Sequence, residues 1–241
     1  MGSWTAARLA TIALVPLLLA RPAAAEKLVD VTACGQVVPK GKVGVLTGDL
    51  DCSSTNVEGV HLSPGAKLRL SSFTLTASHF GVLCDPVGVC KVFGPGVIRR
   101  PTLDTSPAPE NYAIFSGRGV ELRDGVTLEN WQLGVYGGGA TTLKQVVINS
   151  CVNGADGWPI RVIGSTFTGN GYALIGGAGT SPGGLFSFSA PRVVDSTFSG
   201  NLVDMASFAR PTVRRTSCST SWHLTRPATP FSGGDDWQVC N

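Results

Sequence analysis

The sequence of 241 residues predicts an all-β protein, a single-domain right-handed parallel β-helix with disulfide-tied N-terminal and C-terminal caps. Two observations carry this prediction. A six-residue segment occurs twice, as Ser-Thr-Phe-Thr-Gly-Asn at 165–170 and as Ser-Thr-Phe-Ser-Gly-Asn at 196–201. Around both copies, apolar residues recur about every 20 residues, and Gly, Asn, Ser and Thr fill the positions between them. This composition is typical of short strands and turns.

The repeat extends in both directions from Phe167 and Phe198. Ile148 lies 19 residues before Phe167, Cys218 lies 20 residues after Phe198, and Leu128 lies 20 residues before Ile148. A period of about 20 residues is too short for paired-helix repeats, which need about 33 residues or more. One strand-rich rung cannot bury its own apolar face, whereas a stack of rungs can. We therefore expect two inward columns, one of Ile148, Phe167, Phe198 and Cys218, the other of Leu143, Val162, Val193 and Val213.

Polar residues at fixed places in the repeat predict further columns. Asn170 and Asn201 both stand three residues after the Phe, and Cys151 takes this place one rung earlier. Stacked Asn side chains hydrogen-bond along a β-stack, so we expect a structural role for this column. Arg161 and Arg192 both stand six residues before the Phe, which predicts that they stack on adjacent rungs.

The Ser-Thr-Phe-x-Gly-Asn rungs resemble those of secreted right-handed β-helix proteins of the pectin-lyase-like superfamily, over about residues 59–220. The segment from Cys34-Gly35 to the Leu-Thr-x-Asp-Leu-x-Cys motif at 46–52 is similar to the entry segment of the same proteins. The resemblance implies the fold more than an activity, since one fold carries many functions. Enzymes of this superfamily mostly cut or epimerise acidic polysaccharides, using carboxylates set close together.

Residues 1–25 have the pattern of a signal peptide. Arg8 precedes an apolar stretch at 10–20, and Ala23-Ala24-Ala25 forms a cleavage site. The apolar run is short for a membrane-spanning helix, although an uncleaved anchor is the alternative. The pattern predicts a secreted or periplasmic protein with no membrane span after signal cleavage.

All seven cysteines follow the predicted signal peptide, so they belong to an oxidising compartment. No C-x-x-C pair occurs, and we expect no metal and no cofactor. Sequence alone leaves the connectivity open. Proximity favours the pairs Cys34–Cys52, Cys84–Cys90 and Cys218–Cys240, with Cys151 unpaired.

The chain is divided into a signal peptide (1–25), an N-terminal cap (26–56), the β-helix (57–218) and a C-terminal capping tail (219–241). Turn signals separate strand candidates at 59–62, 67–70, 73–76, 82–84, 89–93 and 97–98. Two segments leave the regular pattern, 101–111 with three prolines and 176–189 rich in Gly and Ser. The Asn-Gly and Asp-Gly steps at 153–158 predict a bend or loop.

No catalytic residue can be assigned from the sequence. Gly-x-Ser-x-Gly, a phosphate loop and a dinucleotide fingerprint are all missing. No column of the repeat stacks one acid on another, and Asp156 is interpreted as a turn residue. The net charge of +3 without a Lys/Arg run argues against a nucleic-acid partner.

Five residues are candidates for ligand binding. Arg161 and Arg192 are either two exposed arginines or a contact for a carboxylate-bearing sugar. Trp131, Tyr136 and Trp158 come from the middle rungs, and they either stack on sugar faces or pack beneath a loop. We expect any ligand groove to be lined by both arginines and at least one of these aromatic residues.

The leading hypothesis is an exported non-catalytic β-helix protein that binds an extended acidic polysaccharide or acts as a surface or envelope component. The alternative is a polysaccharide lyase, glycoside hydrolase or uronate epimerase with loop-borne catalytic residues. A third hypothesis is a self-associating module, although the sequence favours a monomer.

Overall fold

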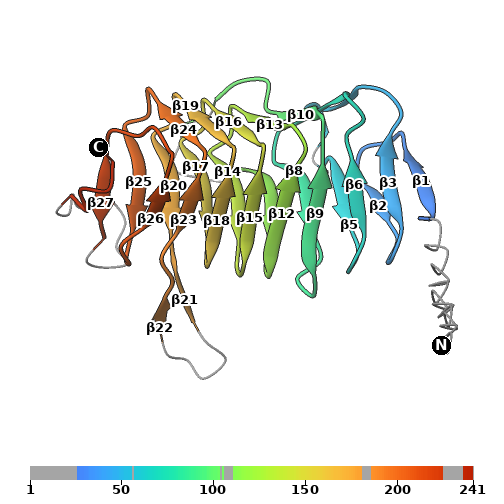
Figure 1. The fold of residues 1–241 in the computed structure, drawn as a ribbon. Coiled ribbons are helices and arrows are strands. Elements are labelled where there is room, and N and C mark those ends of the chain that lie inside the picture. Colours follow the sequence, from blue (N-terminus) through green and yellow to red (C-terminus); the bar gives the residue numbers. More distant parts are fainter. Residues whose placement is uncertain are drawn as a thin grey trace, which may run out of the picture.

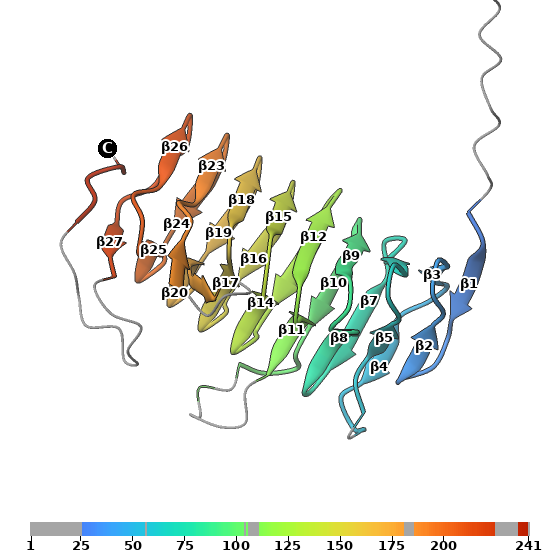
Figure 2. The same cartoon turned by 90° about the horizontal axis from the view of Figure 1, so that it is seen from below.

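The computed structural model describes residues 26–55, 57–103, 105, 111–180, 186–224 and 236–240. The predicted signal peptide lies outside these residues. Within them the chain winds through three sheets, named A, C and B in the order the chain visits them, and every strand of these three sheets pairs in parallel with strands of the neighbouring rungs. Figure 1 shows the rungs side by side from one end of the molecule to the other, and in Figure 2 sheets A and B form its two long sides. The predicted all-β parallel β-helix is confirmed.

The three sheets take one strand each from a rung. Sheet A contains β1 (Leu28–Val31), β3 (Val43–Leu46), β6 (Lys67–Arg69), β9 (Val89–Phe93), β12 (Gly119–Arg123), β15 (Thr141–Lys144), β18 (Ile160–Ile163), β23 (Arg192–Val194) and β26 (Thr212–Arg214). Sheet C contains β4 (Leu50–Cys52), β7 (Thr74–Ala77), β10 (Gly96–Arg99), β13 (Val126–Glu129), β16 (Val147–Asn149), β19 (Thr166–Thr168) and β24 (Thr197–Ser199). Sheet B contains β2 (Gln36–Val38), β5 (Val60–Leu62), β8 (Phe80–Cys84), β11 (Tyr112–Ser116), β14 (Leu133–Gly137), β17 (Asn153–Gly157), β20 (Tyr172–Gly176), β25 (Val203–Ser207) and β27 (Ser221–His223).

The insertion predicted at 176–189 forms a hairpin of β21 (Ala178–Thr180) and β22 (Phe186–Phe188). Its strands are antiparallel to each other and join none of the three sheets. The hairpin projects from the stack in Figure 1. No helix of the described chain is long and apolar enough to cross a membrane.

Both predicted core columns are present. Leu143 is in register with Val162, and Val162 with Val193, which in turn faces Val213 on the next rung. Phe167 is in register with Phe198, and the two rings stack almost parallel with centroids 4.7 Å apart. Burying large apolar side chains in this way supplies most of the stabilising free energy, at about 25 cal/mol per Å².

Side chains in two buried columns hold the turns between strands. The Ser165 hydroxyl accepts a hydrogen bond from the Val146 amide (3.2 Å), and the Ser196 hydroxyl accepts one from the Ser165 amide (3.2 Å). In the predicted Asn column, Asn170 Oδ1 accepts from the Cys151 amide (2.9 Å) and Asn201 Oδ1 from the Asn170 amide (2.9 Å). These bonds satisfy buried amides at places where the chain turns.

The prediction of a loop at 153–158 was wrong, because β17 is a regular strand of sheet B. Asn153 and Ala155 pair in register with β14 on one side and with β20 on the other. A Cβ atom at Gly154 would collide with the carbonyl oxygen of Ala173, and one at Gly157 with the Thr141 side chain. The glycines are therefore required by close packing between rungs, not by a turn.

The stack begins before the predicted boundary at residue 57, since residues 28–52 already supply β1 to β4. The predicted disulfides are present. Cys34 between β1 and β2 is bonded to Cys52 at the end of β4, and Cys84 at the end of β8 is bonded to Cys90 in β9. Cys151 is free and buried.

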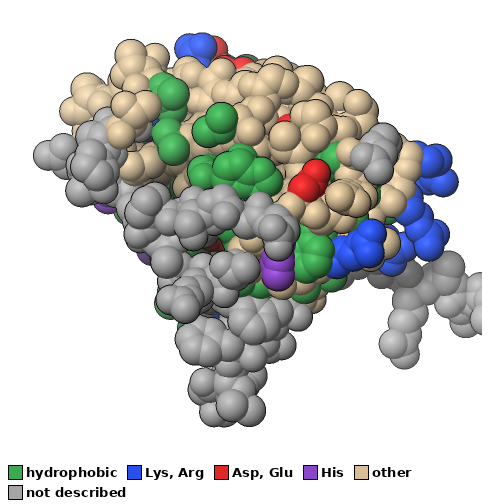
Figure 3. All heavy atoms as spheres, turned by 90° about the vertical axis from the view of Figure 1, so that its left-hand side faces the viewer, with side chains coloured by type: hydrophobic (Ala, Val, Ile, Leu, Met, Phe, Trp, Pro, Cys, Tyr) green, Lys and Arg blue, Asp and Glu red, His purple; other side chains and the backbone are tan. Residues whose placement is uncertain are grey.

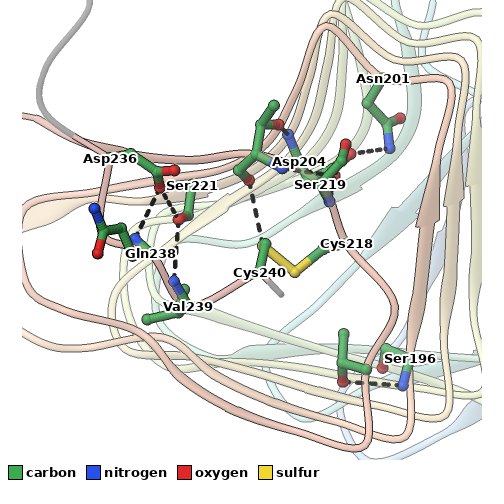
Figure 4. The surroundings of a disulfide bond; sticks show 12 residues. Ser196, Asn201, Asp204, Cys218, Ser219, Ser221, Asp236, Gln238, Val239 and Cys240 are labelled. Atoms are coloured by element: carbon green, nitrogen blue, oxygen red, sulfur yellow. Dashed lines mark hydrogen bonds between the residues drawn. A yellow bond between two sulfur atoms is a disulfide. The ribbon is translucent and has the colours of Figure 1, made fainter.

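At the C-terminal end of the stack, the third disulfide joins Cys218 to Cys240 (Figure 4). Asp204, which is 1% exposed, accepts hydrogen bonds from the Ser219 and Thr220 amides and from Asn201 Nδ2. The Asn column therefore ends on a carboxylate that ties the tail to the stack. Part of the predicted capping tail, residues 225–235 and 241, lies outside the described residues.

We predict that Phe198→Ala lowers the free energy of unfolding by about 3–5 kcal/mol, because it removes a buried ring from the core column. Ser199→Ala, at the exposed neighbouring position, is the matched control and should change the value by less than about 0.5 kcal/mol. Denaturant unfolding of both variants gives the comparison. A loss below about 1 kcal/mol for Phe198→Ala would show that the column is not packed as described.

A single reactive thiol is expected in the denatured, unreduced protein, at Cys151. In the folded protein, burial raises the pKa of the Cys151 thiol to about 12, so alkylation near neutral pH should be slow. Mass spectrometry after alkylation with and without denaturant measures both states. Two or more labels in the denatured protein would contradict the disulfide assignment.

Candidate ligand-binding face

The outer surface of sheet A is lined with basic side chains. Residues alternate between the two faces of a strand, so the neighbours of the buried column that contains Leu143 and Val162 point outward. Register places these outward residues in two columns along the stack. Eight cations stand in them and define the basic face: Lys67, Arg69, Lys91, Arg123, Lys144, Arg161, Arg192 and Arg214.

In the N-terminal half of the basic face, every cation has a carboxylate partner, and each of two carboxylates serves two cations. Glu121 lies 3.1 Å from Lys91 and 3.2 Å from Arg123, and Glu26 lies 2.7 Å from Lys67 and also pairs with Arg69. These ion pairs are partly exposed, so each contributes little to stability. They nevertheless reduce the positive charge that this half of the face can offer to a ligand.

The C-terminal half of the basic face carries Lys144, Arg161, Arg192 and Arg214, which we call the unpaired cluster. All four side chains are exposed, and no carboxylate of the described residues lies within 4.0 Å of any of them. Arg161 and Arg192 are in register on adjacent rungs, as predicted. Rungs about 4.8 Å apart bring these like charges close enough to repel, and an anion between them would relieve that repulsion.

Figure 3 looks onto the C-terminal end of the stack, and Lys and Arg side chains gather mainly at its right-hand edge. Beside the unpaired cluster, Arg215 forms an ion pair with Asp195. The Arg215 side chain hydrogen-bonds to Asp195 and holds the pKa of that carboxyl below its ordinary value. The Asp195 carboxylate therefore pairs with Arg215 and not with a cation of the unpaired cluster.

The structure does not bring the aromatic candidates together with the arginines. Trp131 is fully buried and its indole N–H donates to the Ile98 carbonyl (3.1 Å), so it is a core residue and cannot stack on a ligand. Tyr136 lies on sheet B, stacked on Phe115 with centroids 5.3 Å apart. Trp158 lies at the corner between β17 and β18 and is half-buried. The predicted combination of arginines with an aromatic platform therefore has only Trp158 at the margin of sheet A.

Asp156 is not the turn residue that the sequence predicts. It belongs to β17, in register with Tyr136 on one side and Ile175 on the other. Burial raises the pKa of its carboxyl to about 6, and a hydrogen bond from the Gly157 amide offsets part of that effect. A carboxyl with a pKa near neutrality can exchange a proton under ordinary conditions.

Over the part of the chain that the structure describes, no three His, Cys, Asp or Glu side chains group as a metal site would require.

Sequence reasoning missed a polar column on sheet C. The residue that follows the Phe column is Asn149 in β16, and from there the register continues through Glu129 and Arg99 toward Asp51. The signal was available, because Arg99 and Glu129 follow the buried residues Ile98 and Leu128, and Asp51 follows the partly buried Leu50. The insertion at 101–111 lies between Arg99 and Glu129, so it broke the 20-residue period and concealed the part of the column that contains Arg99 and Asp51.

Comparison of the chain with protein-family models, with curated proteins and with solved structures finds no match. The class of protein is therefore defined by the fold and surfaces of the chain itself, a parallel β-helix with a basic face on one sheet.

We predict that Asp156→Asn stabilises the protein at neutral pH. The folded pKa of about 6 lies above the ordinary value of 3.8, so the folded state holds the proton more tightly than the unfolded state. The protonated Asp156 carboxyl therefore adds up to about 3 kcal/mol to the free energy of unfolding at acid pH. This contribution is lost as the pH rises from about 4 to about 6. The gain from Asp156→Asn over wild type should grow accordingly between about pH 4 and pH 7, measured by thermal or denaturant unfolding. An equal difference at both ends of this range would contradict the raised pKa.

Proposed function

We propose that this protein binds an extended acidic polysaccharide on its basic face, along the axis of the stack, without cleaving it. The unpaired cluster carries the proposal. Four cations on four successive rungs have no carboxylate partner among the described residues, whereas each of the four cations on the preceding rungs has one.

A repeating anion suits this face because the face itself repeats. Arg161 and Arg192 are one rung apart, about 4.8 Å, which is comparable to the length of one sugar residue in an extended chain. A guanidinium can hold a carboxylate through two parallel hydrogen bonds, whereas a lysine acts as a point charge. Carboxylates on successive sugars would therefore meet successive rungs. The contacts are exposed, so binding should weaken as salt rises.

The sequence supports the same function and adds the cell compartment in which we expect it. The Ser-Thr-Phe-x-Gly-Asn rungs resemble secreted proteins of the pectin-lyase-like superfamily, and residues 1–25 have a signal-peptide pattern. Three disulfides agree with an oxidising compartment. We infer a secreted or periplasmic protein that meets its polysaccharide outside the cytoplasm, as a glycan-binding protein or as a surface component.

A polysaccharide lyase, glycoside hydrolase or uronate epimerase is the alternative, and one observation favours it. Asp156 is a carboxyl with a pKa near neutrality on a surface that also carries Tyr136. Incubation with polygalacturonate, followed by ultraviolet absorbance and chain-length analysis, separates the two functions. The binding function predicts no unsaturated product and an unchanged chain length. Cleavage that is abolished in Asp156→Asn would establish the alternative.

We predict that the double variant Arg161→Ala, Arg192→Ala binds polygalacturonate about tenfold more weakly, since exposed ion pairs contribute about 0.2–1 kcal/mol each. The salt dependence of binding should become shallower, because fewer charges are neutralised. The melting temperature should hardly change, since both side chains are exposed.

The matched control is Lys40→Ala, Lys42→Ala, which removes the same charge from the connection between β2 and β3, where Lys40 is exposed and Lys42 half-buried. Calorimetric titration of both double variants at two salt concentrations measures the effect. Equal affinity in the arginine variant and wild type, or an equal loss in both variants, would refute the basic face as the binding surface.

A further inference from the structure

A groove on sheet C carries charges of both signs. It crosses β4, β7, β10 and β13 and has a volume of about 390 Å³. Volumes of about 300–1,000 Å³ are typical of small-molecule sites. We call it the sheet C groove, and the residues that matter to its chemistry are Asp51, Thr76, Arg99, Arg100, Glu129 and Asn130.

Three charged residues of the groove, Asp51, Arg99 and Glu129, stand in one outward column, and Arg100 lies beside it. Asp51 is in register with Thr76, Thr76 with Arg99, and Arg99 with Glu129. At about 4.8 Å per rung, Arg99 lies about one step from Glu129 and about two steps from Asp51 along the stack. The order along the groove is therefore acid, hydroxyl, base, acid.

The charged groups of this column form no ion pairs with one another. Arg99 Nε donates to the Thr76 hydroxyl (3.4 Å), and no carboxylate of the described chain lies within 4.0 Å of its guanidinium. Glu129 is held by the Asn149 side chain, which donates to Oε1 (3.2 Å), so its second oxygen has no protein partner among the described residues. Neutral neighbours therefore position the side chains of Arg99 and Glu129, and the charged groups of both remain available to bind a ligand.

Asp51 is likewise held in its charged form. Hydrogen bonds from the Ser53 side chain and amide, with a smaller contribution from the charge of Arg99, keep the pKa of Asp51 below its ordinary value. The wall of the groove is made by the residues that leave sheet C, where Arg100 Nε donates to the Ser78 carbonyl (2.9 Å). The floor is thus a guanidinium between two carboxylates.

We propose that the sheet C groove binds a small zwitterionic ligand, whose carboxylate pairs with Arg99 and whose ammonium group pairs with Glu129 or Asp51. A polyanion is disfavoured, because each added carboxylate would meet Glu129 or Asp51. A simple cation is disfavoured by Arg99. Opposite charges a few ångströms apart on one ligand satisfy both kinds of group at once. This site is independent of the basic face, which carries the proposed polysaccharide function on another sheet.

Three probes of nearly equal size test the charge requirement: 4-aminobutyrate, butyrate and butylammonium. Titration of the full chain, followed by calorimetry at low salt, should show 4-aminobutyrate binding at least tenfold more tightly than either singly charged probe. Equal affinity for the three probes, or no binding of 4-aminobutyrate, would overturn the proposal.

Variants then place the binding in the groove. Arg99→Gln and the double variant Asp51→Asn, Glu129→Gln should each weaken 4-aminobutyrate binding at least fivefold, with the melting temperature measured alongside to show that the fold is kept. The matched control, Arg161→Ala with Arg192→Ala, removes cations from sheet A and should leave the affinity for 4-aminobutyrate unchanged. Unchanged affinity in either groove variant, or an equal loss in the control, would overturn the assignment.

Discussion

The parallel register between successive rungs is the constraint on which the rest of the structure depends. Hydrogen bonding between strands fixes the rungs about 4.8 Å apart, so every residue of a rung stands above its equivalent in the rung before. Val162 and Val193 therefore extend the core, while Arg161 and Arg192, one residue away, extend a charged column on the surface. The core and the surfaces follow from the same pairing, and a slip of one residue would exchange them.

Buried polar side chains keep this register where the chain turns. The Asn column runs from Cys151 through Asn170 to Asn201, and Asp204 joins it to the Ser219 amide at the C-terminal end (Figure 4). A fully satisfied network of this kind is stabilising, but the loss of one member leaves buried groups unpaired. The disulfide Cys218–Cys240 ties the same end covalently.

The columns could be predicted from sequence because their members recur at the same position of a repeat of about 20 residues. The prediction failed where the sequence does not show that spacing. Gly154 and Gly157 resemble turn residues, and only the neighbouring rungs show that they are small because Ala173 and Thr141 lie against them. Trp131 is polar enough at its indole N–H to resemble a surface residue, yet the Ile98 carbonyl satisfies it inside the core. The groove on sheet C could not be predicted because an insertion separates β10 from β11, so the spacing of equivalent residues there is no longer about 20.

The central claim is that a repeating polyanion lies along the unpaired cluster of sheet A. Chemical-shift mapping of the isotope-labelled protein with a galacturonate oligomer tests this most directly, because it locates the contact without altering the protein. We expect the largest shifts in β15, β18, β23 and β26, with much smaller shifts in β3 and β6, where Glu26 neutralises the face. Shifts confined to sheets B or C, or spread evenly over the protein, would contradict the account.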